Sequence, residues 1–471
     1  MHIPFDNTYA ALPPGFYSRQ APTPVKAPQL LAFNGPLAAT LGITEEDPQA
    51  LADLFAGNAL PEGAAPLAQL YAGHQFGSYN PQLGDGRAIL LGEVVGRDGL
   101  RRDIQLKGSG PTPYSRMGDG RAWLGPVLRE YVVSEAMHAL GIPTTRALAA
   151  VATGEHIWRE QGALPGAVLT RVAASHLRVG TFQVFAHRGE VEALRTLTDY
   201  AIARHYPDAD GPMGLLAEVC AAQARLVAKW MAVGFIHGVM NTDNCTISGE
   251  TIDYGPCAFM DAYDEARVFS SIDQTGRYAY GNQPRIAVWN MAQLATSLIQ
   301  QMEDKEATVE EATMLVHAMP GQLQDAWLGA FGRKLGLAAA TAEDQPLIED
   351  LLGLMQTDGA DFTNAFSALG TDTAQDQFTD RAAFAAWQDR WHKRIETEAD
   401  PEATMAAANP RLIPRNHRIE AMIDAAVAGD MAPFTRLTQA LATPFTMSDD
   451  NADLARPPSQ QEIVPATFCG T

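Results

Sequence analysis

The hydrophobic residues between Leu83 and about Val172 occur in short runs separated by Gly-containing turns. Short apolar runs bounded by turn residues are typical of β-strands. The runs are RAILLGEVV, RRDIQLKG, RALAAVAT, EHIWRE and GAVLTRVA. One segment, residues 125–140, has apolar side chains at helical spacing instead. The region therefore predicts several strands and a single helix.

Helical periodicity dominates from Thr196 onward. Residues 213–235 are long and apolar enough for a buried central helix, residues 285–302 predict a second helix, and Ala-rich segments continue the pattern to about residue 442. Residues 1 to about 80 differ from both regions, because they are rich in Pro and Gly and contain only short helical pieces such as PQALADLFAGN.

A chain of 471 residues is too long for one small core, so we expect two or more packed lobes. The order of the patterns predicts an α+β fold in four parts. These are an N-terminal extension that wraps the body (1–80), a small β-rich lobe (81–195), a larger helical lobe (196–445) and a flexible tail (446–471).

Charge and composition narrow the possible partners. The formal net charge is −21, from 55 acidic and 34 basic side chains, and this balance argues against a nucleic-acid surface, which needs a basic stripe. The N-terminus does not resemble a secretory signal, and no apolar stretch approaches the roughly 18 residues of a membrane helix. The four cysteines contain no C-x-x-C pair, which disfavours a structural zinc site. We expect a cytoplasmic, mostly reduced protein.

The segment LGDGRAILLGEVVGRDGLRRDIQLKG has the order of a kinase nucleotide-binding lobe, with a Gly-bearing turn followed by strands, the last of which ends in Lys107. Gly84 and Gly86 permit close approach of the backbone to a ligand, and Lys107 is a cation for phosphate oxygens. Kinases orient this Lys with a Glu on the lobe's single helix, where Glu130 and its rival Glu135 lie. The alternative is a plain hairpin with a surface Lys and an exposed helix carboxylate.

The tetrapeptide GDGR occurs twice, at 84–87 and 118–121. Two such turns on either side of Lys107 could frame one ligand, although chance recurrence is the alternative in a chain with 40 Gly residues. Arg171 and Arg178 lie in TRVAASHLRVGTFQ, and Arg grips phosphate oxygens through paired hydrogen bonds. Each Arg alone would equally suit a surface position or an ordinary salt bridge.

The segment HGVMNTDNCTISGETIDYG (237–255) has the pattern of a kinase catalytic centre without its central Asp. Val239 stands two residues after the loop His, where such enzymes keep that Asp. Asn244 and Asp253 offer hard oxygen donors that suit Mg²⁺, and we expect a strand–turn–strand hairpin to bring them together. Asp243 is the carboxylate of the loop that could act as base. Alternatively, Asp253 merely caps a turn of the hairpin.

These segments together resemble the selenoprotein O (SelO) family of protein kinase-like enzymes. The matching stretches span residues 71 to about 425, and they are YAGHQFGSYNPQLGDGRA, QLKGSGPTPYSRMGDGRAWL, REYVVSEAMHALGIPTTR, TRVAASHLRVGTFQ, GFIHGVMNTDNCTISGETIDYGPCAF and NPRLIPRNHRIEAMI. The resemblance implies a bilobal protein kinase-like fold with ATP bound in a flipped orientation. It also implies transfer of AMP from ATP, or of UMP from UTP with Mn²⁺, to Ser, Thr or Tyr hydroxyls of proteins.

The resemblance also implies a role for each matching residue. Asp243 would be the base, Asn244 and Asp253 would hold Mg²⁺ or Mn²⁺, and Glu130 would pair with Lys107. The nucleotide site would consist of Gly84, Gly86, Arg87, Lys107, Asp119, Gly120, Glu130, Arg171, Arg178 and Asp253. We expect protein substrates, no nucleic acid, no membrane and a monomeric chain.

Two other functions stay open, and one family feature is in doubt. A conventional phosphotransferase is disfavoured by Val239, and a pseudokinase scaffold that only binds nucleotide is disfavoured by the intact Lys107, Glu130 and metal ligands. Family members often carry a Cys or selenocysteine near the C-terminus, and some pair it with a Cys in the segment after the metal Asp. Here Cys469 is present but residues 264–280 contain no Cys, so the resemblance does not carry an internal disulfide over to this chain.

Overall fold

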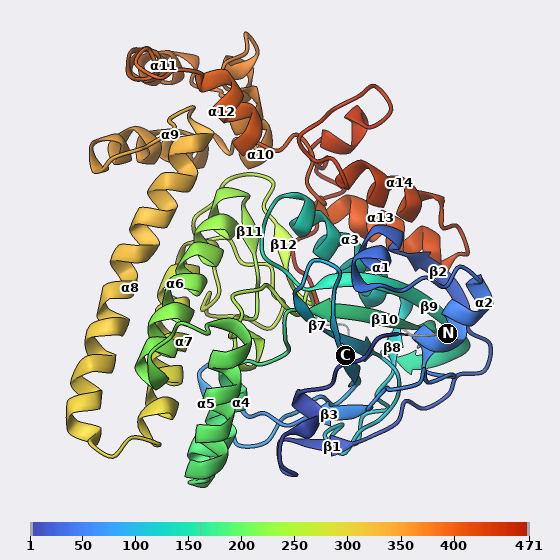
Figure 1. Cartoon of the computed structure of the whole chain (residues 1–471). Coiled ribbons are helices and arrows are strands. Elements are labelled where there is room, and N and C mark those ends of the chain that lie inside the picture. The colour runs from blue at the N-terminus through green and yellow to red at the C-terminus, as the bar shows by residue number, and fades with distance from the viewer. Residues whose placement is uncertain (1–2, 161, 469–471) are drawn as a thin grey trace.

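The computed structural model describes residues 3–160 and 162–468 and has an α+β architecture. Its centre is an eight-stranded antiparallel sheet with the strand order β1-β3-β6-β7-β10-β9-β2, to which β8 adds by pairing with β10 (Figure 1). The strands are β1 (Tyr17–Arg19), β2 (Gln29–Phe33), β3 (Leu67–Gln69), β6 (Ala88–Val95), β7 (Arg101–Lys107), β8 (Ala122–Trp123), β9 (Arg146–Arg159) and β10 (Gly162–Ala173).

The strands predicted from the apolar runs are present, with one correction. The runs RALAAVAT and EHIWRE are not two strands but one continuous strand, β9. Gly154 has a φ of 71° and lies where the register between β9 and β10 shifts. A Gly in this left-handed conformation accommodates a bulge without ending the strand, which explains why the predicted turn is absent.

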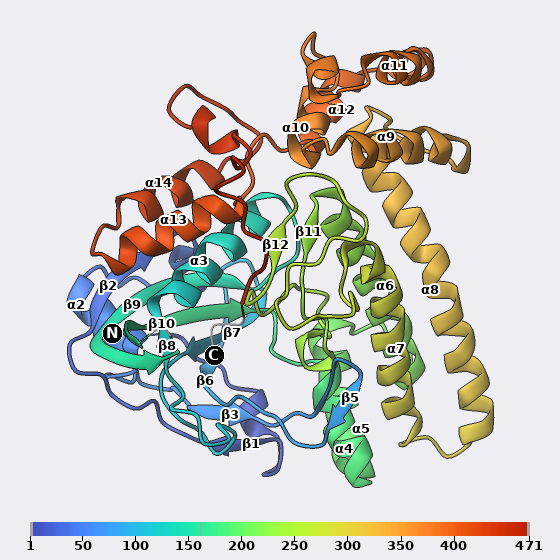
Figure 2. The same ribbon diagram turned by 180° about the vertical axis from the view of Figure 1, so that it is seen from behind.

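The predicted helix of this region is α3 (Leu124–Ala139), which packs on β9 and β10. Nearly all of its side chains are buried, because the sheet covers one side and two helices from the end of the chain cover another. These are α13 (Asn416–Val427) and α14 (Ala432–Leu441), which lie beside α3 in Figure 1 and Figure 2. The last helices of the chain therefore support the sheet and its helix.

The N-terminal segment contributes to the sheet as well as to its surface. β1 and β3 extend one edge and β2 forms the other. The short helices α1 (Gly35–Leu41) and α2 (Pro48–Ala56) pack with the sheet in a second apolar core. The helical piece predicted in PQALADLFAGN is α2, which Asp47 caps at its start and Gly57, with φ 86°, ends.

The remaining helices form a second part of the molecule (Figure 2). The predicted central helix is α6 (Gly211–Ala232), which packs against both α7 (Gln283–Ile299) and α8 (Lys305–Lys334). None of the helices in the described ranges is long and apolar enough to cross a membrane. The helices are α4 (Val179–Arg188), α5 (Val191–His205), α6 (Gly211–Ala232), α7 (Gln283–Ile299), α8 (Lys305–Lys334), α9 (Gln345–Asp358), α10 (Phe362–Ala368), α11 (Arg381–Ile395) and α12 (Pro401–Ala408).

The last residue of α8, Lys334, is buried without a carboxylate partner among the described residues. Its ammonium group lies 4.3 Å from the ring centre of Phe366 and 5.4 Å from that of Phe362. Burial lowers the pKa of Lys334 from 10.5 to about 7, because a charged ammonium loses its hydration there.

Lys334→Met is expected to stabilise the protein, because it removes this buried amine and keeps an unbranched side chain. We expect the free energy of unfolding to rise by roughly 1–4 kcal/mol at about pH 6. Above about pH 7 the native Lys334 releases its proton while the unfolded chain keeps it, so the gain should shrink towards pH 10. Urea unfolding at the two pH values measures this. The exposed Lys305→Met is the control, and an equal change in both variants would contradict the burial argument.

Candidate active site

Two cations and two carboxylates meet where the sheet, α3 and the loop after residue 244 come together. Lys107, at the end of β7, donates from Nζ to Glu130 Oε2 (2.6 Å) and to Asp253 Oδ1 (2.7 Å). Arg171, on β10, donates from Nη2 to Glu130 Oε1 (2.5 Å) and to Asp253 Oδ1 (3.0 Å). We call these four residues the charge cluster. The expected Lys107–Glu130 pair is present, and the rival Glu135 instead pairs with Arg146 (2.7 Å).

The charges of the cluster keep both carboxylates ionised, although Glu130 is buried and Asp253 is partly buried, with 34% of its side chain exposed. Burial opposes the ionisation of Asp253, but Lys107 and Arg171 outweigh it and hold the pKa of this carboxyl well below its usual range. The same balance, with Arg171 as the larger favourable charge, lowers the pKa of Glu130. A buried carboxylate held by two cations is a rigid group with a permanent charge.

Arg178 joins the first GDGR turn to the loop that contains Asp243. It is buried, its guanidinium lies 4.2 Å from the ring centre of Tyr71, and Nη1 donates to the carbonyl oxygen of Asp243 (3.3 Å). Nη2 lies 3.7 Å from Oδ1 of Asp85. Burial raises the pKa of Asp85 although Arg178 opposes the shift. Asp85 was not among the predicted site residues, although its place in the first GDGR turn was a signal for it.

The two GDGR turns have different environments. In the first, Gly84 has a φ of 97° and Asp85 points inward, while the carbonyl oxygen of Arg87 accepts a bond from Gly108 N (2.7 Å). In the second, Gly120 has a φ of 65°, and a Cβ on it would lie 2.2 Å from the backbone of Gly110. Only Gly is compatible with that approach.

Asp119 of the second turn is largely exposed and bound to Arg159 of β9 (2.8 Å). A cavity of about 370 Å³ opens beside Arg87 of the first turn and Lys107 and Glu130 of the charge cluster. Arg87, Lys107, Glu130 and Arg159 line it, and Thr467 near the end of the chain lies at its side. The second turn therefore reaches this cavity through the partner of Asp119.

Asp243 lies in the 3-10 turn η2 (Thr242–Asn244). Its Oδ2 accepts a bond from Nε2 of Gln75 (3.3 Å), while its buried Oδ1 has no partner among the described residues. Burial raises the pKa of Asp243 to about 6. Val239, at the position of the kinase Asp, is buried and has no proton-accepting side chain. One carboxylate oxygen of η2 is thus buried without a hydrogen-bond partner among the described residues.

The predicted hairpin between Asn244 and Asp253 is wrong in its pairing. A turn is present, but Thr246 bridges Arg178 and Thr251 bridges Thr144, so the two halves do not form a ladder with each other. Thr246 Oγ1 instead closes the turn by bonding to the backbone of Glu250. Side-chain bonds of Thr compete with ladder bonds in this way, and the neighbouring segments supply the remaining partners.

Asn244 and Asp253 each leave one oxygen without a partner among the described residues. Asn244 donates from Nδ2 to the carbonyl oxygen of Val239 (3.0 Å), which leaves its Oδ1 available. Asp253 uses Oδ1 for Lys107 and Arg171 and has Oδ2 left. The described chain contains no group of three or more His, Cys, Asp or Glu side chains placed around a metal. Amide and carboxylate oxygens are hard donors, and two of them suit Mg²⁺ or Mn²⁺ when phosphate oxygens complete the shell.

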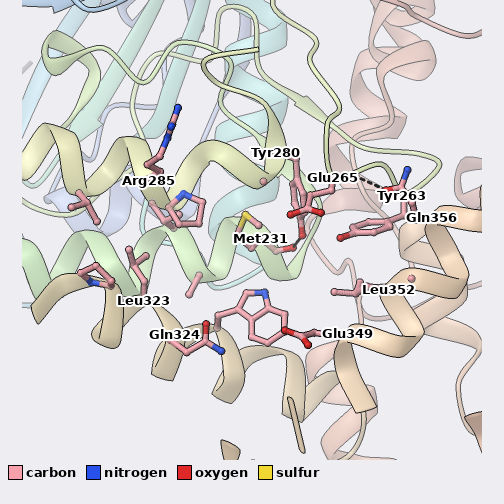
Figure 3. A pocket seen from close by; sticks show the side chains of 18 residues that line it. Met231, Tyr263, Glu265, Tyr280, Arg285, Leu323, Gln324, Glu349, Leu352 and Gln356 are labelled. Carbon is pink, nitrogen blue, oxygen red and sulfur yellow. Dashed lines mark hydrogen bonds between the residues drawn. The ribbon is translucent and has the colours of Figure 1, made fainter. Parts of the chain in front are cut away.

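Two other features lie outside this site. A cavity of about 730 Å³ opens between α6, α7, α8 and α9, with Met231, Leu323 and Leu352 on its walls (Figure 3), and none of the predicted site residues lines it. Cys257 is a buried free thiol whose pKa burial raises to about 11. Cys469 lies outside the described residues, so a disulfide of this cysteine stays an untested possibility of the family.

Known proteins match nearly the entire chain. The model of the family described as protein adenylyltransferase SelO matches residues 1–442. A protein nucleotidyltransferase YdiU of Roseobacter denitrificans is 70% identical over 468 residues, which cover 99% of both chains. Another of that name from a Ruegeria species is 70% identical over 471 residues, covering 100% of both chains, and one from a Jannaschia species is 60% identical over 478 residues, covering 100% of this chain and 99% of the relative.

Glu130→Gln is expected to destabilise the fold strongly, because Lys107 and Arg171 would then share only Asp253. Breaking a buried charge network in this way typically costs about 3–5 kcal/mol. The exposed pair of Asp350 and Arg390 (2.8 Å) provides the control, and Asp350→Asn should change the free energy of unfolding by less than about 1 kcal/mol. Urea unfolding of both variants measures the difference. Similar small losses would show that the cluster is not a structural constraint.

Proposed function

Because the chain belongs to the family of protein adenylyltransferase SelO, it is a protein nucleotidyltransferase, and we propose that it transfers AMP from ATP to Ser, Thr or Tyr hydroxyls of other proteins. The observation behind the finer part of this proposal is the position of Asp243. Its carboxylate is buried and keeps one oxygen free, whereas Val239 occupies the place of the kinase base. In this loop, the carboxylate suited to receive a hydroxyl proton therefore lies at position 243 instead of position 239, where protein kinases have it.

We further propose that the molecule has the two lobes of a protein kinase-like fold. The sheet with α3 would be the smaller lobe, and the part built on α6, α7 and α8 the larger one. The Lys107–Glu130 pair between strand and helix supports this, because protein kinases orient their nucleotide-binding Lys with such a Glu. Asn244 and Asp253 follow on the other part in the order of the kinase metal ligands.

The phosphate chain of the nucleotide would bind with its β- and γ-phosphates towards the basic groups. Lys107 and Arg171 face one another across Glu130 and Asp253, and Arg178 lies next to Asp243. Cations held in a buried network are preorganised for a leaving pyrophosphate. In this flipped orientation the α-phosphorus, rather than the γ-phosphorus, would face Asp243. Arg87, Asp119 and the glycines of the two turns complete the proposed nucleotide site.

The transfer reaction follows from these positions. The carboxylate of Asp243 accepts the hydroxyl proton of the protein substrate, the hydroxyl oxygen forms a bond to the α-phosphorus, and the bond from this phosphorus to the bridging oxygen breaks, so that pyrophosphate leaves. A pKa near 6 makes Asp243 a better proton acceptor than an exposed carboxylate and leaves it ionised at neutral pH. Mg²⁺ or Mn²⁺, bound by Asn244 and Asp253, would supply positive charge that stabilises the phosphate oxygens.

Incubation with ATP labelled at the α- or the γ-phosphate tests the reaction class. We expect label on protein from α-labelled ATP and little or none from γ-labelled ATP, because the γ-phosphate leaves with pyrophosphate. The same assay with α-labelled UTP and Mn²⁺ distinguishes AMP from UMP transfer. Transfer from the γ-position alone would identify a conventional kinase, and binding without any transfer would identify a pseudokinase scaffold.

Asp243→Asn is expected to lower turnover about 10²- to 10⁴-fold, the usual contribution of a positioned general base. Nucleotide affinity should change far less, because the proposed phosphate and metal ligands are other residues. Steady-state AMP transfer and calorimetric titration with ATP measure the two quantities. Val239→Asp in the Asp243→Asn background should not restore transfer, because its carboxylate would serve a differently placed phosphorus. The exposed Asp208→Asn is the control, and full activity of Asp243→Asn would refute the assignment of the base.

A further inference from the structure

A short hairpin from the N-terminal segment lies directly against the turn that contains Asp243. It consists of β4 (Gly73–Gln75) and β5 (Ser78–Asn80), and it packs on α4. The label β5 marks its position in Figure 2. None of the residues proposed to bind the nucleotide or the metal lies in this hairpin. Its sequence, GHQFGSYN, is a motif whose function the nucleotide and metal roles leave unexplained.

Three hydrogen bonds connect consecutive residues of the hairpin to consecutive residues of the loop. His74 N donates to Thr242 Oγ1 (2.7 Å), and Phe76 N donates to Asn241 Oδ1 (3.1 Å). Between them, Gln75 Nε2 donates to Asp243 Oδ2 (3.3 Å). The outer two bonds fix the backbone of the hairpin, and the central bond is the one that reaches the carboxylate.

The contact is too close to be a loose packing of two loops. A Cβ on Gly73 would lie 2.6 Å from Oδ1 of Asp243, so the hairpin backbone itself forms one wall of the carboxylate's environment. Phe76 has a φ of 51°, which is unfavourable for a residue with a Cβ. Such strain persists where the surroundings determine the conformation and is concentrated at functional sites. Here it turns the Phe76 amide towards Asn241.

Further residues hold both partners of this contact. Gln183 of α4 accepts from Thr242 Oγ1 at its Oε1 (2.6 Å) and bonds His74 Nδ1 through its Nε2 (2.8 Å). The hydroxyl of Tyr278 donates to Asn241 Oδ1 (2.6 Å). These bonds hold the hairpin and η2 together as one unit. Among them, the bond from Gln75 is the one that reaches the carboxylate of Asp243.

We propose that Gln75 is a positioning residue, whose amide holds Oδ2 of Asp243 and so fixes the orientation of the carboxylate that receives the hydroxyl proton. This inference rests on the proposed role of Asp243 as the base. An ionised carboxylate only accepts hydrogen bonds, so the amide nitrogen of Gln75 must be the group that faces it. Without this bond we expect the carboxylate to adopt several orientations, so that its acceptor oxygen is no longer held towards the hydroxyl. A bond of 3.3 Å is long for this contact, as is common before substrate binds.

Gln75→Met tests the role, because Met keeps an unbranched side chain of similar length and has no donor. We expect kcat for AMP transfer to fall about 10- to 100-fold, the scale of a misplaced catalytic group, while KM for ATP and the melting temperature stay unchanged. Gln75→Glu should lose at least as much, because it places a second carboxylate against the first. The exposed Gln82→Met is the matched control and should behave like the parent protein.

The double variant with Asp243→Asn decides whether Gln75 acts through Asp243. A positioning residue has nothing left to position there, so adding Gln75→Met to Asp243→Asn should cause no further loss of kcat. An equal loss in both backgrounds, or a raised KM for ATP with unchanged kcat, would overturn the inference. If Gln75→Met has a normal kcat while Asp243→Asn is inactive, the inference about Gln75 is overturned and the assignment of Asp243 as the base stands. Full activity of Asp243→Asn overturns the base itself, and the role of Gln75 with it.

Discussion

The charge cluster of Lys107, Glu130, Arg171 and Asp253 is the interaction that the geometry of the site depends on. A charge taken out of water is costly unless it is paired and hydrogen-bonded, and all four groups are paired with one another. Two strands, α3 and a loop supply them, so these elements can be buried together in only one relative arrangement. The cluster thereby determines how the sheet meets the loop region that contains Asp243 and Asn244.

Asp243 differs from the charge cluster, because its carboxylate is buried near cations but forms no direct ion pair within the described chain. Its pKa rises because it is buried, and its Oδ1 has no hydrogen-bond partner among the described residues. The charge cluster and Asp243 thus combine two requirements of a transfer site: permanent charges that bind, and a carboxylate that remains basic. Arg178 connects Asp243 to the first GDGR turn, since it contacts the backbone of Asp243 on one side and Asp85 on the other.

The local predictions were confirmed where short-range patterns decide the structure. The strands β6, β7 and β10, the helices α3, α6 and α7, and the small helix α2 follow from periodicity and from Gly and Asp at their ends. The predictions were wrong where the same local sequence pattern is compatible with two different structures. Gly154 allowed a bulge where a turn was predicted, and the chain between Asn244 and Asp253 found its partners in distant segments instead of in itself.

The sequence by itself determined which chemical groups are present, their order along the chain and the elements that hold them, because these properties depend on neighbouring residues. The pattern of residues did not decide whether Glu130 or Glu135 pairs with Lys107. It also did not show that the two GDGR turns differ in burial, with Asp85 buried and Asp119 at the surface. It also gave no reason to connect Gln75 with Asp243. Only the tertiary structure decided these points, because each depends on contacts between segments far apart in the chain, where burial and charge select one partner among several of the same type.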